Sequence, residues 1–383
     1  MKIILDGSDA IVGTRAIRRY TINLINEFAL GNQTDQIKIF QNYFRGKNKA
    51  FDDKINNKKN ITKVRYPLPR HLSLPLWKIF NFPPINIFTG NADIFHALGD
   101  DCPPIKNAAY IMTLHGIVYM SRPDLVDPIY VSQKNEWLRR MTRRAGFFIS
   151  VSEHTKKEFL KYFSFIKPER VRVIPLGVGS EFRIIPKDET QKQLYRRFNV
   201  SQPYILYVGG LEPHKNIKGI IRGFSILARH YPDLMLFLVG CEYEPPQDII
   251  SLISNLNLRN RIRIMKYMHQ GSDDLPILYN GAECFIFPSF SEGWTSPPLE
   301  AMACGTPVVT SNVSSLPETV NDAALLVDPN SHEDISQAMD NVLCDSELNK
   351  KLQQKGLQHV AKFTWKRCAD KTYAFYKEVF ESK

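Results

Sequence analysis

AECFIFPSFSEGWTSPPLEAMACGTPVVTSN, residues 282–312, holds the pattern that decides the fold. The short apolar run Cys284–Pro288 predicts a buried strand, and the small polar residues of Ser289–Ser296 predict a loop. Pro297–Cys304 predicts a helix, and Thr306–Thr310 predicts the next strand. Strand, loop, helix and strand in this order form one unit of a parallel sheet in an α/β protein.

The helix expected in this stretch has signals at both ends. Ser296 is placed to cap its N-terminus, and Pro297 occupies the first helical position. Gly305 follows the last turn, where a left-handed backbone is wanted, and Pro307 prevents continuation. Ligands of parallel sheets bind at the carboxyl ends of the strands, where a starting helix presents N–H groups and its positive dipole end. The stretch therefore suits a ligand that carries phosphate.

Two carboxylates flank this point, Glu292 in the loop and Glu300 in the first turns of the helix. The Glu-x7-Glu spacing followed by AMACGTPVV, residues 301–309, resembles the signature of the retaining glycosyltransferases of family GT4, which have the GT-B fold. The resemblance implies that Glu292 meets the donor sugar and that Glu300 holds the ribose hydroxyls. The alternative is a helix-start Glu that serves only the dipole and a solvated loop Glu.

Composition sets outer limits. A chain of 383 residues suggests two or three domains, and none of its apolar runs approaches the roughly 20 residues that span a bilayer. The start, MKIILDGSD, turns polar after five residues and predicts a first strand, not a signal peptide. Six scattered cysteines without CxxC spacing indicate reduced, buried thiols in a cytoplasmic protein.

The charge is placed unevenly along the chain. Residues 1–180 hold 28 Lys and Arg against 15 Asp and Glu, a net charge of +13, whereas residues 181–383 hold 22 against 24, a net of −2. Nucleic acid, a membrane surface or an acidic ligand could each explain the basic half. The chain shows no RRM, KH or zinc-finger pattern, no GxGxxG after a strand and no GxxxxGK[ST]. These absences disfavour nucleic-acid modules, classical dinucleotide dehydrogenases and P-loop enzymes.

The first half resembles the family at scattered points. After the predicted strand Lys2–Asp6, many family members carry Gly-Ile-Gly before Arg-Tyr, but Ala16 and Arg18 replace both glycines here. Gly13 is then the expected donor-binding residue of this loop. Whether Arg15 or Arg18 stands in for a phosphate-side arginine stays open.

His115 directly follows the buried strand predicted over Ala109–Leu114. A residue that leaves the carboxyl end of a parallel strand faces the ligand side of the sheet. The resemblance implies that this His approaches the donor sugar. A structural His whose ring is satisfied by the fold is the alternative.

Basic residues concentrate in two places of the first half. The helix predicted over Tyr130–Ala145 carries four arginines on one broad face, and residues 45–70 form a basic, solvated segment with a short strand near Ile61–Tyr66. We expect peripheral contact with an anionic membrane, and a generally basic soluble enzyme is the alternative. The basic residues concerned are Arg139, Arg140, Arg143 and Arg144, and Lys47, Lys49, Lys58, Lys59 and Lys63.

In the second half the predicted strand Tyr204–Val208 ends in Gly209 and Gly210. Lys215 and Asn216 open the next helix, predicted over Ile217–Tyr231. A Lys at a helix start after a strand is a natural diphosphate contact. The family uses a Lys-Asn pair at this point for the donor diphosphate. The arginine that many members have at Gly210 or His214 is missing, so neutralisation is expected to rest on Lys215. A solvent-exposed helix residue is the alternative.

The resemblance also marks donor-binding positions beyond these. The family's backbone meets the nucleobase where Tyr267 and Met268 stand, but Lys266 replaces the usual glycine and leaves base identity open. The donor-binding positions implied in total are Gly13, Gly209, Gly210, Lys215, Asn216, Tyr267, Met268, Gly293, Trp294, Thr295, Ser296 and Glu300. The catalytic positions implied are His115, Glu292 and Lys215.

The expected architecture is α/β with the GT-B fold, two Rossmann-like domains facing a central cleft. We expect an acceptor-binding domain over residues 1–180, a nucleotide-sugar-binding domain over 181–362, and a helix over 363–383 that crosses back to the first domain. No cofactor or metal is expected, because no Asp-x-Asp follows a strand at the donor site.

The expected activity is retaining transfer of a hexose from a nucleotide-diphosphate sugar to a glycan or lipid-linked glycan. GDP-mannose is the first candidate donor, because Gly-Leu-Glu-Pro-x-Lys-Asn, residues 210–216, resembles bacterial mannosyltransferases of surface-polysaccharide assembly. A UDP-sugar-dependent transferase, or an epimerase or phosphorylase on a GT-B-like scaffold, are the alternatives, since a fold does not fix chemistry. A nucleic-acid-binding module is a further alternative.

Overall fold

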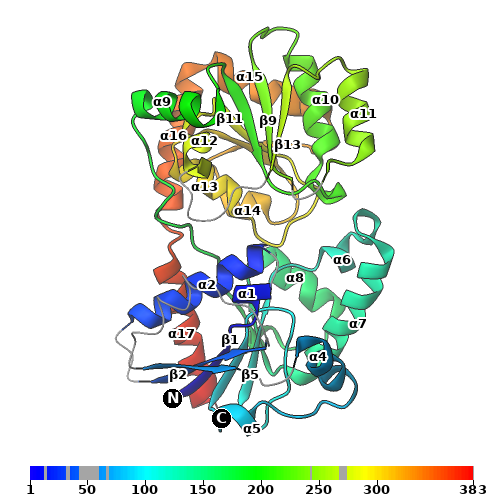
Figure 1. The fold of residues 1–383 in the computed structure, drawn as a ribbon, viewed down its shortest axis with the longest axis vertical. Helices are drawn as coiled ribbons and strands as arrows, with labels where there is room; N and C mark the ends of the chain where they lie inside the picture. Colours follow the sequence, from blue (N-terminus) through cyan, green and yellow to red (C-terminus); the bar gives the residue numbers. More distant parts are fainter. Residues whose placement is uncertain are drawn as a thin grey trace. The chain divides into compact units, whose positions relative to one another are not determined.

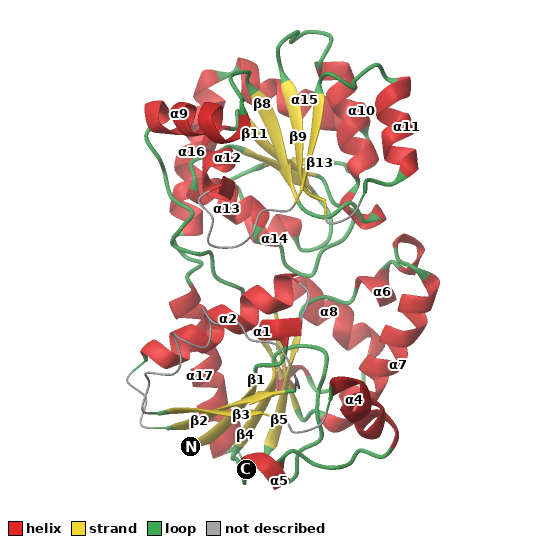
Figure 2. Cartoon of the chain, viewed as in Figure 1, coloured by secondary structure: helices red, strands yellow, loops and turns green. Residues whose placement is uncertain are grey.

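The computed structural model describes residues 1–12, 15–31, 35–42, 60–65, 69–241, 244–266 and 274–382. They divide into two compact units. The first contains Met1–Ile117, Ser132–Gly177 and Trp365–Lys383, and the second contains Val118–Val131 and Val178–Thr364. Each unit is an α/β body with one parallel sheet between layers of helices, as the sequence predicts (Figure 1, Figure 2).

The first unit is built on a seven-stranded parallel sheet of order β3-β2-β1-β4-β5-β6-β7. Its inner strands are buried apolar runs, as expected for a sheet covered on both faces. The strands are β1 Lys2–Asp6, β2 Gln36–Gln41, β3 Ile61–Arg65, β4 Ile94–Ala97, β5 Ala109–Leu114, β6 Phe147–Ser150 and β7 Val171–Val173. The helices are α1 Asp9–Val12, α2 Arg15–Leu30, α4 Arg70–Ile79, α5 Asn86–Thr89, α7 Pro128–Arg144, α8 Glu153–Tyr162, η2 Pro168–Arg170 and α17 Trp365–Glu381.

The last helix, α17, packs against α2 within the first unit (Figure 1). The rings of Phe28 and Tyr376 stack with their centroids 5.8 Å apart. Trp365 begins the helix and lies with its ring 6.4 Å from that of Tyr20. The end of the chain is therefore part of the first unit's core.

The second unit is built on a six-stranded parallel sheet of order β10-β9-β8-β11-β12-β13. Its strands are β8 Tyr204–Val208, β9 Met235–Cys241, β10 Ile262–Lys266, β11 Cys284–Phe287, β12 Val308–Ser311 and β13 Leu325–Val327. The helices are α6 Val118–Ser121, η1 Pro123–Leu125, α9 Lys187–Phe198, η3 Pro213–Lys215, α10 Ile217–Leu227, α11 Gln247–Asn255, α12 Asp274–Gly281, α13 Pro297–Ala303, α14 Leu316–Val320, α15 His332–Cys344 and α16 Ser346–Val360.

Each sheet has one place where the strand order reverses. In the first unit β1 lies between β2 and β4, and in the second β8 lies between β9 and β11. The loops that leave the two neighbouring strands diverge at such a point and leave a crevice for ligands at the carboxyl ends. The fold thus indicates that ligand-binding residues lie in the loops after β1 and β4 and in those after β8 and β11.

The strand–loop–helix–strand prediction over residues 282–312 is confirmed by β11, α13 and β12. Gly305 has the left-handed backbone expected after α13, with φ of +76°. The strand predicted from Thr306 begins only at Val308. Thr306 instead donates its N–H to Ala301 O at the end of α13, and Pro307 has no N–H to give.

Two other expectations need correction. The helix predicted over Ile217–Tyr231 ends at Leu227. Arg229 and His230 continue it only as turns, with N–H groups bonded to the carbonyls of Ile226 and Leu227 three residues earlier. Of the six free cysteines, Cys344 is exposed and the other five are buried. No helix in the described parts of the chain has both the length and the apolar composition needed to cross a bilayer.

Candidate active site

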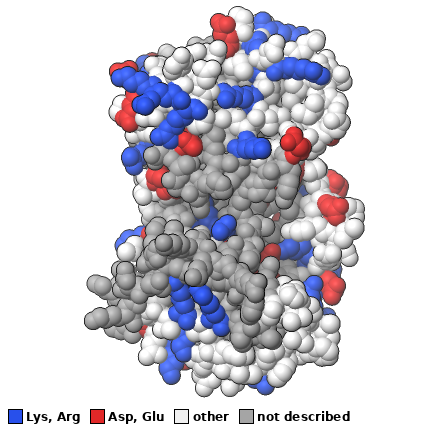
Figure 3. Space-filling model, viewed as in Figure 1, with Lys and Arg blue, Asp and Glu red and all other residues white. Residues whose placement is uncertain are grey.

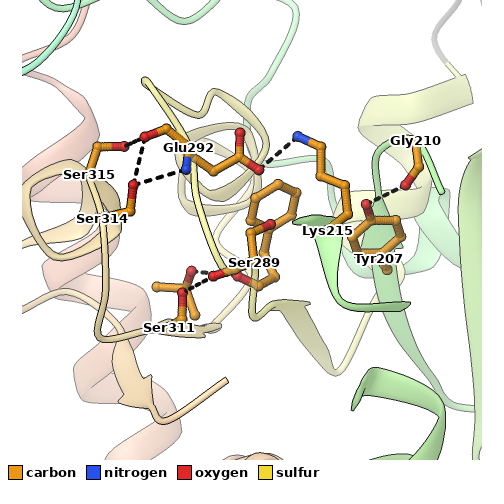
Figure 4. Close-up of polar contacts among 10 residues, drawn as sticks. Tyr207, Gly210, Lys215, Ser289, Glu292, Ser311, Ser314 and Ser315 are labelled. Atoms are coloured by element: carbon orange, nitrogen blue, oxygen red, sulfur yellow. Dashed lines mark hydrogen bonds and ion pairs between the residues drawn. The ribbon is translucent and has the colours of Figure 1, made fainter. Parts of the chain in front are cut away.

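Lys215 and Glu292 form an ion pair at the reversal point of the second sheet (Figure 4). Lys215 ends the turn η3 that follows β8, and Glu292 lies in the loop that follows β11. The Lys215 ammonium nitrogen is 2.7 Å from Oε1 of Glu292 and 5.4 Å from the ring centroid of Phe287. Their side chains are only 18% and 9% exposed. Two residues 77 positions apart, each predicted for the donor site, thus meet there.

The backbone of Glu292 is held by two serines from the loop between β12 and α14 (Figure 4). The Ser314 hydroxyl accepts the Glu292 N–H at 3.0 Å and donates to the Glu292 carbonyl at 2.8 Å. Ser315 donates to the same carbonyl at 3.0 Å. The Glu292 side chain therefore projects from a fixed backbone and is preorganised for binding.

Asn216 follows Lys215 and caps α10. Its Oδ1 accepts the Gly219 N–H at 3.2 Å, and its Nδ2 donates to the carbonyls of Pro288 and Pro329 at 3.1 and 2.7 Å. Both N–H groups of the amide are thus used inside the protein. Asn216 ties the loop after β8 to the loop after β11 and so positions Lys215.

Gly209 and Gly210 continue β8 into this loop. The Gly209 N–H donates to the Val239 carbonyl at 2.9 Å, and the Gly210 carbonyl accepts from the Tyr207 hydroxyl at 2.7 Å (Figure 4). At Gly240, where φ is +120°, a Cβ atom would come within 2.4 Å of the Gly209 carbonyl oxygen. Close approach of the Gly209 backbone therefore explains the glycine at position 240.

Glu300 lies on α13 and is 1% exposed. Its Oε2 accepts a hydrogen bond of 3.0 Å from the hydroxyl of Tyr279, which comes from α12. The carboxylate is thus anchored by a buried tyrosine.

The start of α13 differs from the prediction in one respect. Ser296 stands at the N-cap position, but its side chain makes no capping hydrogen bond. Pro297 and Pro298 fill the first two helical positions and carry no N–H, so only Leu299 and Glu300 can donate in the first turn. The Glu300 N–H is already accepted by the Ser296 carbonyl. The phosphate-binding capacity expected of this helix start is therefore reduced.

Three further predicted residues lie between Glu292 and α13. Gly293 and Trp294 are partly buried, and Thr295 is buried. The Trp294 ring packs at 5.4 Å from that of Phe363, and its indole N–H is buried with no hydrogen-bond partner among the described residues. Gly13, Tyr267 and Met268 lie outside the described residues, as does the side chain of Arg15. Arg18 is exposed and donates from Nε to the Ala10 carbonyl at 3.0 Å.

In the first unit, His115 leaves the end of β5 beside the loop after β4. Its Nε2 lies 2.7 Å from the carbonyl oxygen of Leu98. Since a carbonyl only accepts, Nε2 carries the proton, and Nδ1 is the free acceptor of the neutral ring. Burial lowers the pKa of His115 and favours this neutral form. The ring of Tyr20 meets it edge-on, with centroids 4.9 Å apart.

Beneath His115 a buried polar chain links four elements. The Tyr20 hydroxyl lies 3.1 Å from Thr113 Oγ1, which lies 2.7 Å from Nε2 of His96. Nδ1 of His96 lies 2.5 Å from the Tyr376 hydroxyl on α17. Burial lowers the pKa of His96 to about 3. The C-terminal helix is thus hydrogen-bonded into the support of His115.

Sequence reasoning missed the residues that support the predicted ones. Tyr279 donates to the Glu300 carboxylate, and Ser314 and Ser315 hold the backbone of Glu292. Tyr20 and His96 lie behind His115. Tyr, Ser and buried His are ordinary residues in α/β cores, and no local pattern separates these from others. The available signal was only their position near the carboxyl ends of strands.

Two family descriptions match the sequence. "Glycosyl transferases group 1" matches residues 188–359, and "Glycosyltransferase Family 4" matches residues 17–182. Among relatives, O-antigen chain mannosyltransferase B of Escherichia coli is 28% identical over 98% of this chain and 100% of its own length. Serotype-specific mannosyltransferase WbdA of Escherichia coli is 30% identical over 74% of this chain, which spans only 35% of that longer protein.

Solved structures agree on the fold. Sucrose-phosphate synthase from Thermosynechococcus elongatus superposes with a TM-score of 0.75 at 19% identity, covering all of both chains. The matches on either side of residue 185 are to one kind of enzyme, and the two parallel-sheet units have its architecture. The chain belongs to family 4 of the glycosyltransferases, also described as glycosyl transferases group 1.

Proposed function

We propose that this glycosyltransferase moves a hexose from a nucleotide-diphosphate sugar to a glycan or lipid-linked glycan during surface-polysaccharide synthesis, with GDP-mannose as the first candidate donor. The observation that carries the proposal is the Lys215–Glu292 pair at the reversal point of the second sheet. The mannosyltransferase names of the Escherichia coli relatives support the choice of sugar.

In this proposal Lys215 binds the donor diphosphate, and Glu292 accepts hydrogen bonds from the sugar hydroxyls. The 2.7 Å ion pair engages both groups with one another. A diphosphate offers Lys215 more negative charge than one carboxylate does, so donor binding exchanges the partner of Lys215. Glu292 is then released toward the sugar while Ser314 and Ser315 keep its backbone in place.

Glu300 is proposed to hold the ribose. It is buried and anchored by Tyr279, and a carboxylate can accept two hydroxyl hydrogens at once. His115 is proposed to contact the donor sugar through Nδ1, the acceptor that its bond to Leu98 leaves available. His115 belongs to the first unit and directly follows β5 at its carboxyl end.

The reaction breaks the bond between the anomeric carbon and the diphosphate oxygen and forms a bond from an acceptor hydroxyl to the same carbon. The transition state resembles an oxocarbenium ion leaving a diphosphate. We propose attack on the face from which the diphosphate departs, with the acceptor's proton passing to the leaving oxygen, so that configuration is retained. Lys215 and the first N–H groups of α10 stabilise the leaving charge without a metal.

Thermal-shift measurements with UDP-, GDP-, ADP- and TDP-sugars test the donor assignment. Only the true donor should raise the melting temperature strongly, since at a given concentration a ligand that binds the folded state more tightly stabilises it more. Lys215→Ala should abolish that shift. A shift with UDP-sugars alone would replace GDP-mannose by a UDP-sugar. Turnover of donor without acceptor, or dependence on pyridoxal phosphate, would replace transfer by epimerase or phosphorylase chemistry.

We propose that the enzyme acts in the cytoplasm, in peripheral contact with an anionic membrane. The net charge of +13 on residues 1–180 supports this placement.

A further inference from the structure

Large apolar side chains are exposed together on one segment of the first unit. Of the fifteen exposed large hydrophobic residues among those the structure describes, six fall within residues 72–88. The most exposed are Ile79, Phe80, Phe82 and Ile87, at 71%, 67%, 58% and 62%. They lie on the last turn of α4, the connection after it, and α5. We name these four residues the apolar cluster. Single exposed hydrophobic residues are ordinary, but a group of this kind marks an interaction surface.

The backbone that carries the cluster is held from α7. The Arg140 guanidinium donates to the carbonyl of Lys78 at 3.1 Å, and Arg144 donates to the side chain of Asn81. Arg144 also donates to the Cys102 carbonyl at 2.6 Å. Two of the four arginines predicted to face a membrane therefore make hydrogen bonds within the protein. These bonds fix the connection after α4.

The α5 end is held as firmly. The Ile85 N–H donates to Pro104 O at 2.8 Å, and the side chain of Asn86 exchanges two hydrogen bonds of 2.7 Å with the backbone of Lys106. The cluster is thus exposed on a fixed backbone and cannot turn inward without breaking these bonds. Its exposure to water is unfavourable until another surface covers it.

The surroundings of the cluster are cationic. Residues 69–92 contain Arg70 and Lys78 and no Asp or Glu. Lys78 and Lys106 are exposed on the tethered segments, and Arg139 and Arg143 are exposed on α7, the helix that holds them. Glu136 is the carboxylate of α7 nearest these contacts, and it pairs with Arg140 at 3.5 Å.

We propose that the apolar cluster is the membrane-docking surface of this enzyme, and that its occupant is an anionic lipid bilayer. Apolar side chains with cations beside them match the boundary between acyl chains and negatively charged headgroups. Charge alone does not locate this face, because Lys and Arg side chains also gather over β2 and β3 (Figure 3). A second copy of this chain is a poorer occupant, because a symmetric contact would oppose Lys78, Lys106 and Arg143 to the same cations.

This docking proposal rests on the proposed function in one respect, because a lipid-linked acceptor would be presented at the membrane surface that the apolar cluster enters. The claim that the cluster binds a membrane does not depend on which donor the enzyme uses. It requires only that the protein bind vesicles, so the binding measurement itself needs neither donor nor acceptor.

The test is sedimentation of the full chain with vesicles of phosphatidylglycerol and phosphatidylcholine, compared with pure phosphatidylcholine, at low and at high salt. We expect binding to the anionic vesicles that weakens with salt. Phe80→Ser with Ile87→Ser should reduce the partition coefficient at least tenfold, because it removes apolar surface and leaves the charge unchanged. Lys78→Gln with Arg143→Gln should reduce it by roughly thirtyfold on anionic vesicles, as expected for two interfacial cations.

Two matched variants serve as controls. Leu30→Ser with Phe165→Ser removes two exposed hydrophobic residues elsewhere on the same unit. Lys157→Gln with Lys161→Gln removes two exposed cations from α8. Both should bind like the unchanged protein, and all four variants should keep the unchanged protein's turnover on a water-soluble acceptor.

Equal binding to neutral and anionic vesicles, or equal losses in the cluster variants and their controls, would overturn the proposal. A dimer in solution that Phe80→Ser with Ile87→Ser dissociates would assign the cluster to a second copy instead. If vesicle binding follows the expectation but no nucleotide sugar is used, the proposed function fails and the docking surface stands.

Discussion

The Lys215 ammonium nitrogen lies 2.7 Å from the Glu292 carboxylate, across the point where β8 and β11 send their loops in different directions. The pair is largely buried, so each charge is stabilised by the other. In the proposed function, binding of a diphosphate to Lys215 would remove the partner of Glu292 and make that carboxylate available to the sugar. The ion pair would then couple recognition of the diphosphate to recognition of the sugar.

The two carboxylates should fail in different ways when replaced. Glu300→Gln should raise the KM for the donor, because it loses the charged acceptor for the ribose, and Glu292→Ala should mainly lower kcat. A hydrogen bond to a charged group contributes about 1.5–3 kcal/mol, so changes of roughly ten- to a hundredfold are expected. Steady-state kinetics measure both values. Glu283→Gln, an exposed position just before β11, is the matched control and should behave as wild type. Unchanged kinetics in both site variants would refute the assignments.

Metal removal should leave the rate unchanged. The proposal gives the leaving diphosphate to Lys215 and to backbone N–H groups, and no Asp-x-Asp follows a strand at the donor site. The initial rate is measured after treatment with excess EDTA and again with added Mn²⁺ or Mg²⁺. A strict requirement for either ion would contradict the diphosphate assignment.

Asn216→Ala should lower the stability of the second unit by about 2–4 kcal/mol, because it removes three side-chain hydrogen bonds and the cap of α10. The backbone φ of +60° adds strain for Ala. Asn199→Ala is the control, since Asn199 has φ of +52° and an exposed side chain. Urea unfolding should show a clearly smaller loss there. Equal losses at both positions would mean that the side-chain bonds of Asn216 contribute nothing.

Two buried groups should give opposite pH dependences. Burial lowers the pKa of His96 to about 3, whereas an unfolded His titrates near 6.5, so between these values only the unfolded state binds the proton. His96 therefore makes stability rise with pH over that window. Burial raises the pKa of Asp6 to about 8, and the negative charges of Asp101 and Asp9 add to the shift. Between pH 4 and 8 the folded state holds a proton that the unfolded state lacks, so Asp6 makes stability fall as pH rises.

Urea unfolding between pH 4.5 and 6 separates these effects, since each slope is at most about 1.4 kcal/mol per pH unit. Relative to wild type, His96→Gln should make stability depend more negatively on pH. Asp6→Asn should make it depend more positively. Parallel profiles for all three proteins would show that neither group has the shifted pKa.

Local sequence patterns predicted what is locally determined. Pro307 and Gly305 bound α13, and Ser152 caps α8 by accepting the Thr155 N–H at 3.0 Å. These features depend on residues a few positions apart. The pairing of Lys215 with Glu292 was predicted only as a shared site, because the contact itself depends on the order of strands in the sheet.

What escaped prediction is set by tertiary structure. Tyr279 donates to Glu300 from another helix, and no sequence pattern near either residue predicts this hydrogen bond. The helix α4 was not predicted, since Pro75 lies inside it and prolines usually argue against a helix. Arg140 donates to Lys78 on α4, and Arg144 donates to Asn81 just after it. Because α4 was not predicted, these hydrogen bonds were not either, and the four arginines of α7 were interpreted as one basic face.

The anomeric configuration of the product tests the central claim most directly. GDP-α-mannose is incubated with the enzyme and a mannose-terminated acceptor, and the new linkage is determined by nuclear magnetic resonance. The account predicts release of GDP, an α-linked mannosyl product, and loss of that product in Glu292→Ala. A β-linked product would contradict retention. Absence of transfer from every UDP-, GDP-, ADP- and TDP-sugar tried would contradict the assignment of Lys215, Glu292 and Glu300 to a nucleotide-sugar site.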